Sequence, residues 1–250
     1  MSDETVKIGF VGVGTMGQCA HLKNYAALDQ CEVTAIAELR PRLAAEVARK
    51  YGVPRTYRDH TEMLADEDLD GIVASQPYQR HGQIVPELLG ADIPIFTEKP
   101  LAGSVEVGKR IFDAEKYRGT THMLGYHKRS DPATIRTKEE IGRLAESGEL
   151  GELQYVRILM PAGDWVASGF NELISSDEEL PDLEFDPPPP DMDEETRAAY
   201  NSFVNYYIHQ VNLMRHLLGE PYEVTYAEPS GVLLAVESHS GVAGTIEMSP

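Results

Sequence analysis

Short apolar runs alternate with amphipathic segments along the first half of the 250-residue chain. The apolar runs predict strands at 6–11, 33–37, 71–75, 94–97 and 121–126. The segments between them predict helices at about 16–28, 41–51, 60–65, 83–89 and 105–116. Strands that alternate with helices are typical of a parallel sheet with helical crossovers. Residues 1–125 are therefore expected to form a doubly wound α/β domain.

The pattern changes near residue 126. A helix is predicted at 131–147, a strand at 153–160 and a long helix at about 194–218. The remaining apolar runs, at 223–227, 232–238 and 242–248, predict antiparallel strands. Residues 126–250 are expected to form a second, α+β domain with an open, mainly antiparallel sheet.

Three glycines follow the first predicted strand in the order G-x-G-x-x-G: Gly12, Gly14 and Gly17. The first glycine permits a tight turn, the second lets a pyrophosphate approach the backbone, and the third lets the next helix pack close to the sheet. Thr15 and Met16 complete the turn, and the N-terminus of the helix attracts phosphate. This turn predicts a dinucleotide site of the Rossmann type; the alternative is a glycine turn without a nucleotide.

Glu38 follows the second predicted strand, at the position where an acidic residue accepts hydrogen bonds from the adenosine ribose. Because its charge would repel a 2′-phosphate, NAD is the expected cofactor. Arg40 offers a countercharge two residues later, so NADP is kept as the alternative.

Glu98-Lys99-Pro100 follows another predicted parallel strand. Open α/β sheets bind ligands beyond the carboxyl ends of their strands, so Lys99 is expected to reach the nicotinamide and its substrate. A lysine ammonium can stabilise a developing alkoxide. A surface lysine paired with Glu98 is the alternative.

A polar stripe runs along the long predicted helix, at Asn205, His209, Asn212 and His216. The spacing places these side chains on one helix face. Oxidation of an alcohol requires a base with a pKa near neutrality, and a histidine fits that role. A core histidine bonded to the backbone or to an asparagine is the alternative.

Composition and charge exclude several classes of partner. The chain has 41 acidic and 22 basic residues and a net charge of −19, which argues against binding to nucleic acid or to anionic membranes. No apolar run reaches the ~18–20 residues of a membrane span, and the N-terminus lacks the pattern of an export signal. Cys19 and Cys31 are expected to be reduced, buried fillers, which suits a cytoplasmic protein, and no metal site is predicted.

Residues 171–195 contain eleven acidic and no basic residues, and four successive prolines at Pro187–Pro190. Such a stretch favours extended conformations and offers little apolar surface to bury. We expect a solvated loop inserted in the second domain that contributes little to folding. A role in binding a partner or covering the substrate is left open.

Several motifs along the chain, taken together, resemble the Gfo/Idh/MocA oxidoreductases, which include glucose-fructose oxidoreductase and inositol 2-dehydrogenase. The residues that carry the resemblance are Gly12–Gly17, Glu38, Pro77, His81, Glu98-Lys99-Pro100, Gly125-Tyr126, Arg129, Pro132, Ser147-Gly148, Gly151 and Leu217–Pro221. The resemblance implies a Rossmann domain, a second domain whose open sheet often mediates homo-oligomers, and NAD(P)-dependent chemistry on a sugar, polyol or related cyclic substrate.

The resemblance also implies roles for individual residues. Lys99 matches the lysine of the Glu-Lys-Pro motif, and His209 matches the histidine of the family's Asp-x-x-x-His motif. The expected cofactor contacts beyond the glycine turn, Glu38 and Arg40 are Pro77, His81, Glu98 and Lys99. The expected substrate contacts are Tyr126, His127, Arg129, Asn205 and His209.

This sequence departs from the family pattern in two ways. Asn205 stands where the family has aspartate, and it cannot stabilise an imidazolium by charge. The chain also stops at Pro250, shortly after a predicted strand, which suggests a fragment or a truncated copy. These departures motivate one alternative to a dehydrogenase, a nucleotide-binding sensor or regulator without turnover. The resemblance implies a second, redox-assisted glycoside cleavage or elimination with tightly held NAD.

Overall fold

The computed structural model describes residues 5–160 and 170–248. The described residues form two compact units. The first contains residues 5–125 and 170–191, and the second contains residues 126–160 and 192–248.

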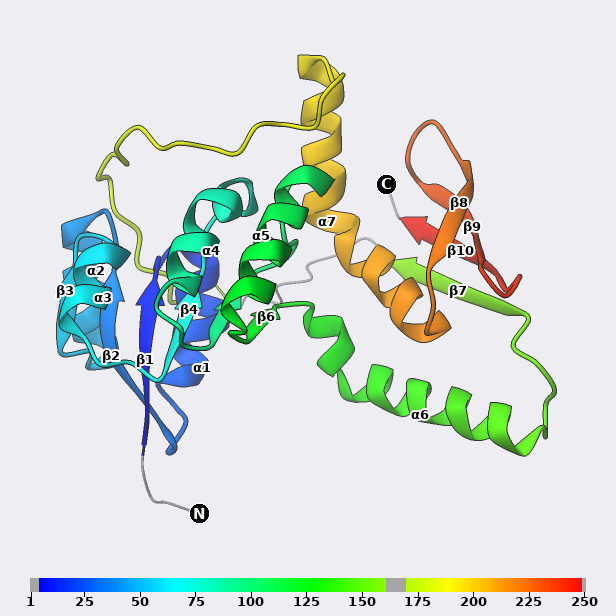
Figure 1. Ribbon diagram of the computed structural model, residues 1–250, viewed down its shortest axis with the longest axis horizontal. Helices are drawn as coiled ribbons and strands as arrows, with labels where there is room; N and C mark the ends of the chain where they lie inside the picture. Colours follow the sequence, from blue (N-terminus) through cyan, green and yellow to red (C-terminus); the bar gives the residue numbers. More distant parts are fainter. Residues whose placement is uncertain (1–4, 161–169, 249–250) are drawn as a thin grey trace. The chain divides into compact units, whose positions relative to one another are not determined.

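The first unit is built on a six-stranded parallel sheet in the order β3-β2-β1-β4-β5-β6 (Figure 1). Its strands are β1 (Val6–Val11), β2 (Cys31–Ala37), β3 (Arg55–Tyr57), β4 (Gly71–Ala74), β5 (Ile95–Thr97) and β6 (His122–Leu124). Its helices are η1 (Gly17–Leu22), α1 (Lys23–Tyr25), α2 (Pro41–Tyr51), α3 (His60–Asp66), η2 (Tyr78–Arg80), α4 (His81–Leu89) and α5 (Val105–Arg118). This architecture confirms the predicted doubly wound sheet.

Two features of the first unit differ from the prediction. The short strand β3 was not predicted, because Arg55-Thr56-Tyr57 contains no apolar run and is largely exposed. The helix expected at 16–28 is instead a π-helical turn, η1, followed by the three residues of α1. A π turn has a wider hydrogen-bonding ring than an α-helix, and residue patterns do not distinguish the two.

Alternation along the strands divides the core of the first unit between the two faces of its sheet. Phe10 of β1 packs with Leu43 and Val47 of α2. The next residue, Val11, joins the opposite cluster with Ile84 of α4 and Ile111 of α5. Helices therefore cover both faces, and strand order reverses between β1 and β4. The carboxyl ends of these two strands are the usual ligand-binding edge of such a sheet.

The second unit combines helices with a four-stranded sheet in the order β7-β10-β9-β8. Its elements are η3 (His127–Ser130), α6 (Pro132–Ser147), β7 (Tyr155–Met160), α7 (Glu194–Leu218), β8 (Tyr222–Ala227), β9 (Leu233–Ser238) and β10 (Ala243–Met248). β7 pairs with β10 in parallel, and the other two pairs are antiparallel. Met214 and Leu217 of α7 pack with Ile246 of β10, which fixes the helix on the sheet. The predicted α+β unit with a mainly antiparallel sheet is confirmed.

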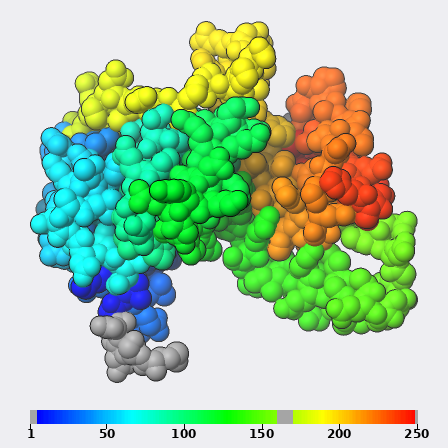
Figure 2. All heavy atoms as spheres, viewed as in Figure 1, coloured from blue at the N-terminus to red at the C-terminus, as the bar shows by residue number. Residues whose placement is uncertain are grey.

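The acidic segment departs from expectation in its surroundings. Residues 170–191 contain no helix or strand, as predicted, but they group with the first unit rather than with the second. Figures 1 and 2 show the segment in yellow tones lying on the surface of that unit. Ile174 exchanges two hydrogen bonds with the Gln18 side chain, and Asp186 is buried. The expectation of a solvated loop was therefore wrong for these residues, because their polar groups bond to the starts of helices.

Candidate functional site

The glycine turn has the shape that a pyrophosphate needs. Gly12 has φ +88°, and a Cβ there would lie 2.3 Å from the Gln76 side chain. A Cβ on Gly17 would lie 2.6 Å from the carbonyl oxygen of Gly12, so the start of η1 packs directly against the turn. At Gly14, by contrast, the nearest atom is a guanidinium nitrogen of Arg40 at 4.0 Å. The backbone is thus closely packed at the outer glycines and open at the middle one, as phosphate binding requires.

The remaining residues of the turn are at its surface. Thr15 is exposed and Met16 is half-buried, immediately before η1. Pro77, beyond the carboxyl end of β4, is also exposed. These positions are compatible with the predicted cofactor contacts, which stay predictions.

Glu38 lies beyond β2 and is 6% exposed. One carboxylate oxygen accepts from the backbone N–H of Val13 at 3.0 Å and from Arg40 Nη2 at 3.2 Å. The other accepts from Arg40 Nε at 2.8 Å and from the backbone N–H of Arg40 at 3.2 Å. A carboxylate has about four acceptor positions, so these donors occupy it. Arg40 therefore binds Glu38 from its backbone and from its guanidinium group.

His21 contacts Glu98 of the Glu-Lys-Pro motif, a contact that the sequence analysis missed. Its Nε2 lies 2.6 Å from a carboxylate oxygen of Glu98, and its ring packs edge-on against Phe96 at 5.0 Å between centroids. The other oxygen of Glu98 accepts from the backbone N–H of Lys99 at 3.1 Å. His21 lies within the π turn, and such turns are frequent at functional sites. The sequence signal was a histidine four residues after Gly17, but only the π geometry shows where its ring lies.

The environment shifts the pKa of both acid–base groups in the Glu-Lys-Pro motif. Burial opposes ionisation of Glu98, but the hydrogen bond and charge of His21 and the N–H of Lys99 outweigh it, so its pKa is lowered. Burial lowers the pKa of the Lys99 ammonium, and the charge of Glu98 partly opposes that shift. A lysine whose pKa is lowered by burial beyond the end of a parallel strand is typical of a functional site. The peptide bond between Lys99 and Pro100 is cis.

His81 is buried at the start of α4. Its side chain is 1% exposed, and Nδ1 lies 3.1 Å from the carbonyl oxygen of Leu101. Burial lowers the pKa of this imidazole, and the backbone carbonyls around it only partly oppose that shift. The ring joins the first residue of α4 to the loop after β5. The predicted cofactor contact of His81 stays a prediction; in the structure its ring bonds to the loop after β5.

In the second unit, η3 and α7 bring together several of the predicted substrate contacts. The rings of His127 and His209 are 4.4 Å apart between centroids, with an interplanar angle of 63°. Arg129 Nε donates to Asn212 Oδ1 at 2.7 Å. Two residues of the polar stripe of α7, His209 and Asn212, thus contact η3, and the exposed Asn205 lies one turn before His209.

Charge and burial also shift the pKa values of groups beside this stripe. Burial lowers the pKa of His216, and the positive charges of Arg129 and Lys138 lower it further. Burial raises the pKa of Tyr126, and the positive charge of Arg129 partly opposes that shift. The arginine therefore adds positive potential at the end of α7 near η3.

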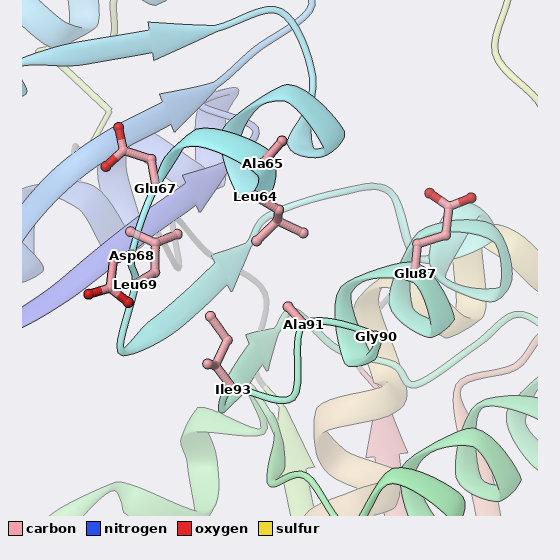
Figure 3. Close-up of a pocket in the computed structure, with 9 residues that line it drawn as sticks. All are labelled: Leu64, Ala65, Glu67, Asp68, Leu69, Glu87, Gly90, Ala91 and Ile93. Carbon is pink, nitrogen blue, oxygen red and sulfur yellow. The ribbon is translucent and has the colours of Figure 1, made fainter.

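A hollow in the first unit lies away from these residues. It is lined by Leu64, Ala65, Glu67, Asp68, Leu69, Glu87, Gly90, Ala91 and Ile93 (Figure 3). These residues precede β4 and β5 in the chain, so the hollow is at the amino edge of the sheet, opposite the glycine turn. Among the described residues, no three His, Cys, Asp or Glu side chains are placed to hold a metal ion, and no helix is both long and apolar enough to cross a bilayer.

Comparison with known proteins identifies the first unit. A family model described as an oxidoreductase family with an NAD-binding Rossmann fold, GFO_IDH_MocA, matches residues 6–126. Myo-inositol 2-dehydrogenase of Thermotoga maritima is 24% identical over 242 residues, which are 97% of this chain and 63% of that protein. The NAD(+)-dependent scyllo-inositol 2-dehydrogenase of Bacillus subtilis is 25% identical over 99% of this chain and 68% of its own length.

A solved structure shows the same fold over nearly the whole chain. Scyllo-inositol dehydrogenase of Lactobacillus casei, with bound NAD(H) and scyllo-inositol, has a TM-score of 0.72 at 17% identity and covers 99% of this chain and 71% of that one. The chain thus spans 63% and 68% of the lengths of these two inositol dehydrogenases. With the glycine turn, Glu38 and Glu98-Lys99-Pro100 in place, this chain carries the NAD-binding Rossmann domain of the Gfo/Idh/MocA oxidoreductase family.

Proposed function

We propose that the protein is an NAD-dependent oxidoreductase that transfers hydride between nicotinamide and a ring alcohol or ketone of a sugar or polyol. The observation that carries the proposal is Lys99, half-buried beyond β5 at the carboxyl edge of a family-matched Rossmann sheet. The names of the relatives, two inositol dehydrogenases among them, support a cyclic polyol as the substrate class.

The turn at Gly12–Gly17 fits the pyrophosphate of NAD, because the open backbone at Gly14 leaves space for it. Arg40 and Glu38 would hold the adenosine ribose. When bound, the nicotinamide ring supplies the acceptor or donor of the hydride.

The chain's own residues would then hold and move the substrate proton. The Lys99 ammonium would donate a hydrogen bond to the reacting oxygen and stabilise negative charge on it. His209 would take the hydroxyl proton on an imidazole nitrogen during oxidation and return it during reduction. His127 and Arg129 would add substrate contacts from η3, and Tyr126 would do so from the residue before it.

The experiment is NAD-dependent turnover with a panel of inositols, cyclic sugars and their ketones, followed by the absorbance of reduced nicotinamide. Oxidation of at least one cyclic polyol is the expected result. Cleavage of a glycoside with no net release of reduced cofactor would instead support the redox-assisted elimination chemistry. Absence of both reactions in a protein that binds NAD would contradict the proposal.

A second candidate function, a cofactor-binding regulator without turnover, is favoured by Asn205. An amide can orient the His209 imidazole, but it cannot stabilise the protonated ring by charge. The variant Asn205→Asp separates the two functions. In a working dehydrogenase it should raise the pKa of the His209 imidazole and move the pH–rate profile upward. Turnover that appears only in the variant would identify the natural protein as the regulator.

The proposal includes assembly and location. On the face of the sheet that α7 does not cover, Tyr155 and Leu159 of β7 and Tyr226 of β8 are exposed, so the sheet presents apolar side chains on which a second copy could pack. We therefore propose a homo-oligomer formed through this sheet, which size-exclusion chromatography with light scattering would test. The free thiols of Cys19 and Cys31 support a cytoplasmic location.

A further inference from the structure

The acidic segment 170–191 bonds to the starts of three helices in the first unit. Its backbone at Ile174 is joined to Gln18 in η1, Glu178 bonds to α2, and Asp186 bonds to α4. The residues that precede α2 and α4, Arg40 and Arg80, provide no side-chain cap of their own. The segment therefore satisfies backbone N–H groups that the helices leave open.

Glu178 binds the first turn of α2 with both carboxylate oxygens. Oε1 accepts from the backbone N–H of Arg42 at 3.0 Å, and Oε2 accepts from the backbone N–H of Leu43 at 3.0 Å. Ser176 donates its hydroxyl to Oε2 at 2.8 Å, and the Glu178 side chain is 13% exposed. A carboxylate with this set of donors occupies the anion site at the helix N-terminus.

The Arg42 guanidinium is also committed to the segment. It donates to Asp177 at 2.6 Å and lies 3.6 Å from Glu178. Arg40, two residues earlier, is held by Glu38. The two arginines that flank Pro41 at the start of α2 are therefore both paired with carboxylates.

This arrangement lies where a cofactor phosphate would be recognised. In a Rossmann site the adenosine ribose lies beyond the second strand, and NADP adds its 2′-phosphate there, commonly on an arginine. The helix that follows that strand is α2, whose N–H groups already bind Glu178. A 2′-phosphate would therefore meet three carboxylates, those of Glu38, Asp177 and Glu178, and two arginines that are already paired.

We propose that Glu178, with Asp177, determines cofactor specificity by filling the anion site that the 2′-phosphate of NADP would require. The inference rests on the proposed function, because it concerns the same cofactor site. It adds to Glu38 a second determinant that lies 140 residues away in the sequence and selects NAD by charge.

The segment is anchored beyond Glu178. Asp186 is buried and accepts from the backbone N–H of Gly82 at 2.7 Å and from Gln83 Nε2 at 3.1 Å. A Cβ on Gly82 would lie 2.3 Å from Asp186 Oδ1, so this contact depends on glycine. Anchors at Ile174 and Asp186 hold Glu178 in place from both sides.

The test compares the dissociation constants of NAD and NADP, measured by calorimetry on the full chain, for Glu178→Gln and for Asp177→Asn/Glu178→Gln. Removal of the charge should lower the ratio of the NADP constant to the NAD constant by about tenfold or more, while NAD binding changes by less than about twofold. Glu179→Gln is the matched control, because Glu179 is exposed and makes no hydrogen bond or ion pair among the described residues. Its ratio should not change.

The inference would be overturned if the ratio of the NADP to the NAD dissociation constant changed no more in Glu178→Gln than in Glu179→Gln. The thermal midpoints must show that both variants are folded. If Glu178→Gln is poorly folded, Asp177→Asn alone serves, since the exposed Asp177 contacts only the Arg42 side chain among the described residues. Wild-type protein that binds neither cofactor would overturn the proposed function itself, which separates the two failures.

Discussion

Two carboxylates at opposite sides of the parallel sheet's ligand-binding edge are stabilised in different ways. Glu98, after β5, is paired with the imidazole of His21. Glu178, which covers the start of α2 near β2, is bound by backbone N–H groups, which do not titrate. The first arrangement pairs a carboxylate with an imidazole beside Lys99, whereas the second places a carboxylate on the backbone N–H groups at the start of a helix. We infer that the β5 side of this edge serves the hydride-transfer reaction and that the β2 side discriminates NAD from NADP.

The largest effect should come from breaking the β5 side. Lys99→Ala is expected to lower turnover by about 10²-fold or more, because the reacting oxygen loses its positive partner. NAD affinity should be mostly retained, since the pyrophosphate site is at the glycine turn. Steady-state kinetics and calorimetry give the two quantities. Lys109→Ala, an exposed lysine on α5, is the control, and equal turnover in the two variants would contradict the assignment.

His209→Ala should produce a loss of similar size, about 10²-fold, if the imidazole acts as the general base. His216→Ala removes a histidine from the same polar stripe two turns later and should retain most activity. The comparison of the two variants shows whether activity depends on His209 in particular or on any histidine of the stripe. A His209→Ala variant with wild-type turnover would show that the base lies elsewhere.

The next effect concerns the anchor of the acidic segment. Asp186→Ala should lower the free energy of unfolding by about 1–3 kcal/mol, because the buried N–H of Gly82 loses its acceptor. Thermal or denaturant unfolding measures the change. Asp182→Ala, at an exposed position of the same segment, should leave stability nearly unchanged. Equal stability of both variants would restore our original expectation of a solvated loop.

The smallest effect comes from the partner of Glu98. His21→Ala should reduce turnover by about tenfold through displacement of the Glu98-Lys99 backbone. The pKa of Glu98 is lowered in the folded state, so its contribution to stability is present above the ordinary carboxyl pKa and is lost as pH falls through the lowered value. The stability difference between wild type and variant should therefore shrink in acid. His60→Ala, which removes the His60–Glu87 pair, is the control and should leave turnover unchanged.

Local patterns predicted the fold and the cofactor turn well, because each depends on neighbouring residues. The glycine turn needs only Gly12, Gly14 and Gly17 after an apolar strand. The strands that begin at Gly71 and Ile95 follow from their apolar runs. The paired strands of the second unit were found in the same way. These features require no knowledge of distant contacts.

The contacts of Glu178 and His21 could not be predicted, because their partners are far away in the sequence. The N–H groups of α2 that bind Glu178 lie about 135 residues before it, and composition alone suggested a solvated stretch. His21 meets Glu98 across 77 residues through a π turn that has no residue signature. The burial of His81 has a related cause, since the sequence does not show that its ring bonds to the loop after β5.

The most direct test of the account is NAD binding to Gly14→Val. A Cβ at Gly14 would have Arg40 Nη2 as its nearest neighbour, at 4.0 Å, so the variant should fold with a thermal midpoint close to that of wild type. The same side chain would fill the space that the pyrophosphate requires, so NAD affinity measured by calorimetry should fall by about 10²-fold or more. A folded Gly14→Val protein that binds NAD as tightly as wild type would contradict the placement of the cofactor at this turn.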